Sequence, residues 1–187
     1  MSKEQVIAKL RAAGVPREAF STTLAKEGMD DIRAYVTGRE EDAKRMLYLY
    51  QTQTRSTLYS EKAELAFFLL AKELVLSGED VFCCDLVNVH TALFKDDDEA
   101  TEFYSRLDNI NSGFIAIRHF HDKGGKVEQF MTPYESAYFA SWLIRKFQDG
   151  VGFILLGGAP IMEAVDWWPA SFLGYLRSRS IVFEVRK

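Results

Sequence analysis

The sequence predicts an α/β fold, in which a mostly parallel five-stranded sheet lies between two layers of helices. Three runs, 81–84, 114–117 and 151–156, are continuously apolar instead of alternating between apolar and polar residues. This pattern is typical of strands that are buried on both faces, as in a parallel sheet covered by helices. Helical segments alternate with these runs along the chain, and parallel strands need such crossovers.

The first 44 residues predict a helical extension of this α/β core, which we place at 45–187. A helix is expected over Ser2–Ala13, because Ser2 and Gln5 have the spacing of a capping box. A second, highly charged helix is expected over Ile32–Lys44. The stretch between these two helices has no clear periodicity.

Within the core, strands are expected to alternate with one or two helices, and the last element is expected to be a strand. The strands are predicted at 46–50, 80–86, 113–118, 151–156 and 180–185. The helices are predicted at 60–77, 87–94, 100–107, 134–148 and 162–175. Pro133 favours the start of the fourth helix, since proline is accepted in a first helical turn, and Pro169 interrupts the last helix.

Composition indicates a cytoplasmic protein that does not bind membranes. The 187 residues are 48% apolar, enough for one domain with its own core. Cys83 and Cys84 are adjacent in an apolar run, so they face opposite sides of a strand and are expected to be buried thiols. No apolar run reaches the roughly 18 residues of a membrane span. The polar start has no apolar core of a signal peptide, and the net charge of −4 does not favour nucleic acid.

The junction after the first strand has the position of a phosphate-binding loop but lacks its chemistry. Such a loop needs glycines, whose backbone N–H groups surround the phosphates, and then lysine followed by serine or threonine for Mg²⁺. Residues 51–61 contain no glycine, and Lys62 is followed by Ala63, which has no hydroxyl group. Glu61 would place negative charge against the phosphates.

The order of the segments resembles the AAA+ core of replicative-helicase loaders of the DnaC and DnaI type, and of the related IstB-type ATPases. Four segments carry the resemblance: a glycine–apolar–proline segment, the strand before the phosphate loop, the helix after it, and the turn into the second strand. They lie at Gly14–Phe20, Arg45–Tyr50, Lys62–Leu74 and Ser77–Phe82. The resemblance implies a three-layer P-loop NTPase fold without a C-terminal lid.

The same resemblance implies that the catalytic positions are degenerate. In the family, the third strand ends in two acidic residues that hold Mg²⁺, and the next strand ends in a polar sensor. Here these strands end in Arg118-His119 and in Gly157-Gly158, while Arg177 and Arg179 lie in the arginine-finger region. The degenerate nucleotide-site positions are therefore Lys62, Ala63, Arg118, His119, Gly157 and Gly158. We expect no catalytic residue, no metal and no cofactor, and we expect that the protein is not an enzyme.

An aromatic cluster near the C-terminal end has two interpretations. Trp167, Trp168, Phe172 and Tyr175 are expected either in the core of a helix or on a surface that binds a partner, because tryptophan and tyrosine anchor interfaces. With Arg177 and Arg179, they are the candidate partner-binding residues.

The function expected from these features is protein–protein binding by an inactive AAA+-like protein in DNA replication or a mobile element. The partner would be a replicative helicase or an AAA+ loader, with DNA contacted only within a complex. Two alternatives stay open. One is a structural or assembly protein that keeps only the fold. The other is a metal-dependent enzyme using His119 and His121, which share one side of an extended segment.

Overall fold

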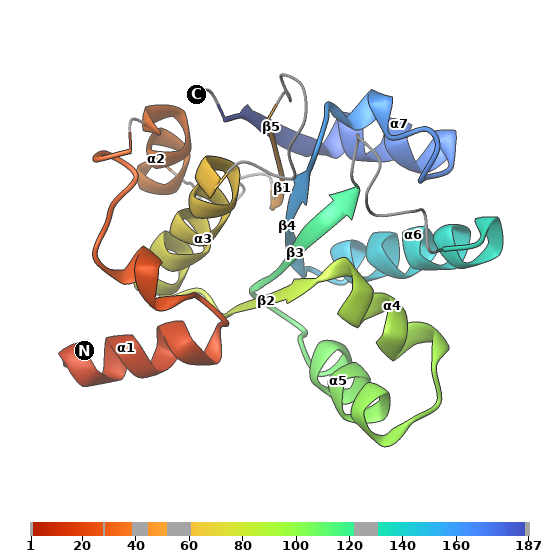
Figure 1. Cartoon of the computed structure of the whole chain (residues 1–187), viewed down its shortest axis with the longest axis horizontal. Coiled ribbons are helices and arrows are strands. Elements are labelled where there is room, and N and C mark those ends of the chain that lie inside the picture. Colours follow the sequence, from red (N-terminus) through yellow and green to blue (C-terminus); the bar gives the residue numbers. More distant parts are fainter. Residues whose placement is uncertain (1, 28, 39–44, 52–60, 122–130, 186–187) are drawn as a thin grey trace.

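A parallel sheet forms the centre of the molecule and confirms the predicted α/β class (Figure 1). The computed structural model describes residues 2–27, 29–38, 45–51, 61–121 and 131–185. Its sheet has five strands in the order β2-β3-β4-β1-β5, and every pairing is parallel. The strands are β1 (Met46–Tyr50), β2 (Val81–Asp85), β3 (Phe114–His121), β4 (Gly152–Gly157) and β5 (Ser180–Glu184).

Helices cover both faces of the sheet and create two hydrophobic cores. One face carries α1 (Lys3–Ala12), the 3₁₀ turn η1 (Arg17–Phe20), α2 (Asp30–Thr37) and α3 (Glu61–Leu76). The other carries α4 (Leu86–Phe94), α5 (Asp98–Asp108), α6 (Pro133–Gln148), η2 (Ile161–Glu163) and α7 (Ala170–Arg179). Among the described residues, no helix is long and apolar enough to cross a membrane.

The continuous apolar runs follow from this sandwich, because successive strand residues enter opposite cores. In β1, Leu47 and Leu49 pack on the α3 side, whereas Met46 and Tyr48 pack on the α6 side. Cys83 and Cys84 separate in the same way, as predicted, and remain free thiols. Burial raises the pKa of Cys83 to about 12 and also raises the pKa of Cys84, so neither thiol is a ready nucleophile.

The N-terminal segment shares a core with α3. Leu10 and Leu24 are buried in the same hydrophobic cluster as the inner face of α3. Lys72 of α3 is only 6% exposed, and its ammonium group donates to three backbone carbonyls of this segment. The acceptors are the oxygens of Ala19, Phe20 and Thr22, at 3.1, 3.2 and 2.6 Å. The predicted boundary at residue 44 lies outside the described residues.

Several predicted helices differ from the structure in extent. Helix α1 and its capping box are confirmed, since the Ser2 hydroxyl accepts from the Gln5 N–H and the Gln5 side chain accepts from the Ser2 N–H. The helix predicted from Ile32 is α2, which begins at Asp30; residues 39–44 lie outside the described residues. The helical stretch predicted over 162–175 is interrupted before Ala170, as expected from Pro169, but its bounds are wrong: it consists of the short η2 and of α7, which continues to Arg179.

Candidate functional site

The candidate site lies at the carboxyl edge of the sheet, where parallel strands end side by side. Ligands of open α/β sheets bind in the crevice outside this edge. Asp85 ends β2, Arg118 lies next to it in the register of β3, and Gly157 ends β4. The first turn of α3, with Lys62 and Glu64, begins at the same edge after β1.

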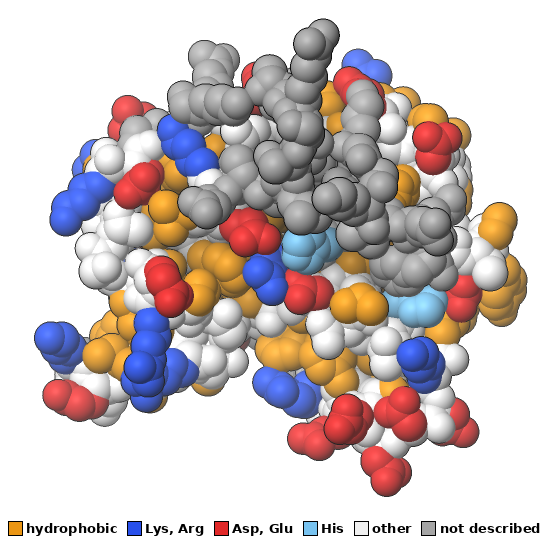
Figure 2. Space-filling model, viewed as in Figure 1, with side chains coloured by type: hydrophobic (Ala, Val, Ile, Leu, Met, Phe, Trp, Pro, Cys, Tyr) orange, Lys and Arg blue, Asp and Glu red, His pale blue; other side chains and the backbone are white. Residues whose placement is uncertain are grey.

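Four charged or titratable side chains meet there in what we call the Arg118 cluster: Arg118, Asp85, Glu64 and His119. Arg118 binds Asp85 with two hydrogen bonds, from Nε to Oδ1 at 2.8 Å and from Nη2 to Oδ2 at 3.1 Å. Its Nη1 lies 3.9 Å from Glu64 Oε1, and its guanidinium group lies 5.1 Å from the centre of the Phe68 ring. Figure 2 shows basic, acidic and histidine side chains side by side near the middle of the face that is turned to the viewer.

His119 reaches the same carboxylates because the strand is irregular. Its φ of 54° is in the left-handed region, and the pairing of β3 with β4 is interrupted between Ile117 and His121. The alternation of side chains is therefore broken. His119 Nε2 lies 3.8 Å from Glu64 Oε1 and 4.0 Å from Asp85 Oδ1.

The described residues do not fit the magnesium ion that the fold implies. The family resemblance places Arg118 where a metal-binding acid is expected, and both oxygens of the neighbouring Asp85 accept from its guanidinium group. Ala63, which the family resemblance places where a metal-binding hydroxyl is expected, is fully buried and has no oxygen in its side chain. The glycine-free loop itself lies outside the described residues. In the described part of the chain, no group of three or more His, Cys, Asp or Glu is placed to hold a metal ion.

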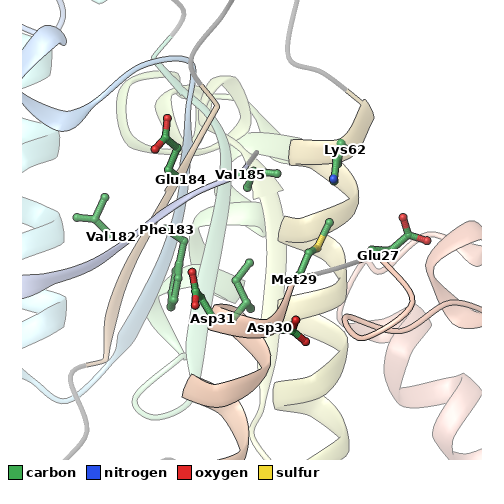
Figure 3. Close-up of a pocket in the computed structure, with 10 residues that line it drawn as sticks. Glu27, Met29, Asp30, Asp31, Lys62, Val182, Phe183, Glu184 and Val185 are labelled. Atoms are coloured by element: carbon green, nitrogen blue, oxygen red, sulfur yellow. The ribbon is translucent and has the colours of Figure 1, made fainter. Parts of the chain in front are cut away.

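Lys62 lines a pocket whose described side chains are mostly acidic or apolar. The pocket has a volume of about 610 Å³ and lies between the start of α2, the start of α3 and β5 (Figure 3). Four of its described lining residues carry carboxylates and one, Lys62, carries positive charge. Its described lining is Glu27, Met29, Asp30, Asp31, Ile32, Lys62, Val182, Phe183, Glu184 and Val185. We call this feature the acidic pocket.

Gly157 and Gly158 form a turn at the end of β4. Both are buried, and neither brings a polar side chain to the edge of the sheet. The turn is fixed by Tyr48 of β1, whose hydroxyl donates to the carbonyl oxygen of Ala159 at 2.7 Å. Where the family resemblance places a polar sensor, Gly157 and Gly158 therefore offer backbone groups alone.

The aromatic cluster is core, and its interpretation as a partner surface is wrong for three of its members. Trp167, Trp168 and Phe172 are 9%, 2% and 2% exposed. Trp168 stacks on Phe120 with ring centres 4.6 Å apart, and its indole N–H donates to the Phe120 carbonyl oxygen at 3.2 Å. These side chains are buried because Phe120, beyond the predicted end of β3, continues the strand beneath them.

The other candidates for partner binding lie nearer the surface. Tyr175 is partly buried, and burial raises the pKa of its phenol. It packs edge-on against Phe147, with ring centres 6.4 Å apart. Arg177 and Arg179 are exposed in the last turn of α7. They are the two predicted partner-binding residues whose charges remain available to solvent.

The fold was compared with those of known proteins. No protein-family model matches the sequence, and no curated protein matches it significantly. Among solved structures, DnaI is similar at a TM-score of 0.62 and 15% identity, over 91% of this chain and 94% of that chain. The DnaC helicase loader is similar at a TM-score of 0.63 and 7% identity, over 91% of this chain and all of that chain (100%).

The chain has the fold of DnaI and of the DnaC helicase loader. The replication initiator DnaA, in a structure bound to AMPPCP and single-stranded DNA, is also similar, with a TM-score of 0.61 and 11% identity. That match covers 92% of this chain but 51% of the DnaA chain. Because the identities are this low, the similarity to all three establishes the fold alone.

Sequence reasoning found part of the candidate site and missed the rest. It identified Lys62, Arg118 and His119, which the structure places at one edge of the sheet. It missed Glu64 and Asp85, although an acidic residue directly after the apolar run of β2 was a usable signal. It also missed the acidic pocket, whose lining residues come from three distant segments. The side chain of His121, the second candidate metal ligand, lies outside the described part of the chain.

Proposed function

We propose that this chain is a catalytically inactive AAA+-like protein that acts by binding another protein. The partner is a replicative helicase or an AAA+ loader, in DNA replication or in a mobile element. The observation that supports this most is the Arg118 cluster, in which an arginine bonds both oxygens of Asp85 at the edge where the family holds magnesium.

The chemistry of phosphoryl transfer explains why this cluster matters. The reaction depends almost entirely on positioning groups and on Mg²⁺ that neutralises the developing charge. A guanidinium group stays protonated at all ordinary pH values and repels a divalent cation. Here it also donates to both oxygens of Asp85, a carboxylate that would otherwise attract one. In this proposal, the positive charge of Arg118 therefore balances the carboxylates at this edge of the sheet without a metal ion.

The proposed partner comes from the similar structures and from the exposed surface. DnaC is described as a helicase loader. Arg177 and Arg179 are exposed at the end of α7, so their charge is free to meet an acidic surface of a partner in place of a phosphate. Helix α1 buries only Leu10 and exposes most of its charged residues, which offers a second contact surface.

We expect the purified chain to bind the replicative helicase or the loader of its host to the same extent with and without ATP. The measurement is sedimentation velocity of the mixture, followed by titration calorimetry to obtain the Kd. Replacing both Arg177 and Arg179 with glutamate is expected to weaken binding about tenfold or more, because reversed charges face the acidic surface.

A charge-matched control is the variant with Arg145→Glu and Lys95→Glu, two exposed residues on α6 and after α4. We expect this control to bind like the unmodified chain. A complex that forms only with ATP would contradict the proposal, as would equal weakening in both double variants.

A further inference from the structure

We propose that the acidic pocket binds an arginine- or lysine-rich segment of a partner protein. The inference rests on the proposed function in one respect, namely that the pocket is not filled by a nucleotide. It names the chemistry of the partner at this site, which the similar structures do not.

Charge determines the class of ligand. Asp30 and Asp31 lie in the first turn of α2, Glu184 lies in β5, and all three are exposed at the pocket. Glu27 adds a fourth carboxylate, one oxygen of which accepts from the Thr22 hydroxyl at 2.9 Å. With Lys62 as the single cation of the described lining, the described charges favour a cationic ligand over a phosphate.

The shape and the apolar floor favour long basic side chains over a small cation. Met29, Phe183 and Val185 are 7%, 8% and 5% exposed and form the floor of the pocket. Arginine and lysine can lay their aliphatic stems on such a floor while their charged ends meet the carboxylates at the rim. A guanidinium group can also bond a carboxylate with two hydrogen bonds.

The edge of the sheet adds a way to hold a peptide. Strand β5 is the last strand in the sheet order, and it pairs with β1 on one side. Its Val182 is 45% exposed and lines the pocket. An extended segment can therefore pair with the outer edge of β5 while its basic side chains enter the pocket, a common mode of peptide recognition.

The test uses a fluorescently labelled hexapeptide of alternating arginine and valine, with a glutamate–valine hexapeptide as the negative probe. Fluorescence anisotropy with the full chain is expected to show saturable binding of the basic peptide alone. The triple variant Asp30→Asn, Asp31→Asn and Glu184→Gln is expected to bind it about tenfold more weakly.

A charge-matched control separates the pocket from general attraction to an acidic protein. The triple variant Asp96→Asn, Asp98→Asn and Glu99→Gln removes the same charge from exposed positions before and in α5. It is expected to change the Kd less than twofold. Lys62→Met, which removes the cation of the pocket, is expected to tighten binding about threefold. No binding by the unmodified chain, equal weakening in both triple variants, or weaker binding by Lys62→Met would each overturn the inference.

Two further experiments test whether the acidic pocket has another occupant. If light scattering shows that the chain self-associates and that the pocket triple variant does not, the occupant is a second copy and the inference is overturned. If ATP with Mg²⁺ binds and displaces the peptide, the proposed function and the inference both fail. If the peptide does not bind and ATP does not bind either, the inference alone fails.

Discussion

Replacing Trp168 with alanine is expected to lower the free energy of unfolding by about 3–5 kcal/mol, as for other buried tryptophans. The indole stacks on Phe120 and also contacts Phe139 and Phe172, so truncation leaves a cavity between β3, α6 and α7. It also removes the donor to the Phe120 carbonyl oxygen. The measurement is urea unfolding followed by circular dichroism.

Two variants make this result decisive. Tyr134→Ala truncates an aromatic residue that is 75% exposed on α6, and it is expected to change stability by less than about 0.5 kcal/mol. Trp168→Phe keeps a ring but loses the indole donor, and it remains measurable if the alanine variant does not fold. A loss below about 1 kcal/mol for Trp168→Ala would mean that this indole is not in the core.

The second large effect is expected at Ile115, at about 2–5 kcal/mol for replacement by alanine. Ile115 is fully buried on the central part of the sheet, where its register partners are Phe82 of β2 and Phe153 of β4. Lys62→Ala is expected to change stability by less than about 0.5 kcal/mol, because Lys62 is only partly buried and is proposed to hold no phosphate.

Val182→Ala is the matched control for the sheet, since Val182 is an aliphatic residue in the edge strand β5 and is 45% exposed. Its effect is expected to be well below that of Ile115→Ala in the same thermal or urea unfolding experiment. Equal destabilisation by Ile115→Ala and Lys62→Ala would contradict the placement of both residues.

The central strands β1, β3 and β4 could be predicted because they are buried on both faces. The runs at 81–84, 114–117 and 151–156 are apolar at successive positions instead of alternating with polar residues. A parallel sheet between two helical layers requires such continuously apolar strands. The same apolar continuity says nothing about where a strand ends. Strand β3 continues to His121, and Phe120 then covers Trp168, so the burial of the aromatic cluster could not be read from the helix alone.

The candidate site depends on contacts between distant segments, which periodicity does not report. Arg118 was recognisable as a departure from the family pattern. Its bidentate bond to Asp85, 33 residues away, was not. The left-handed backbone at His119, which turns a second side chain toward Glu64 and Asp85, has no marker in the sequence either, because glycine is absent at that position.

The binding and hydrolysis of ATP test the proposed loss of catalysis most directly. Titration calorimetry with ATP and Mg²⁺, and release of inorganic phosphate, are to be measured for the unmodified chain and for Lys62→Ala. We expect no appreciable affinity and no turnover in either protein, because Arg118 is proposed to take the place of a metal-binding acid and Ala63 lacks a hydroxyl group. Micromolar affinity for ATP with Mg²⁺-dependent hydrolysis, lost in Lys62→Ala, would contradict the proposal.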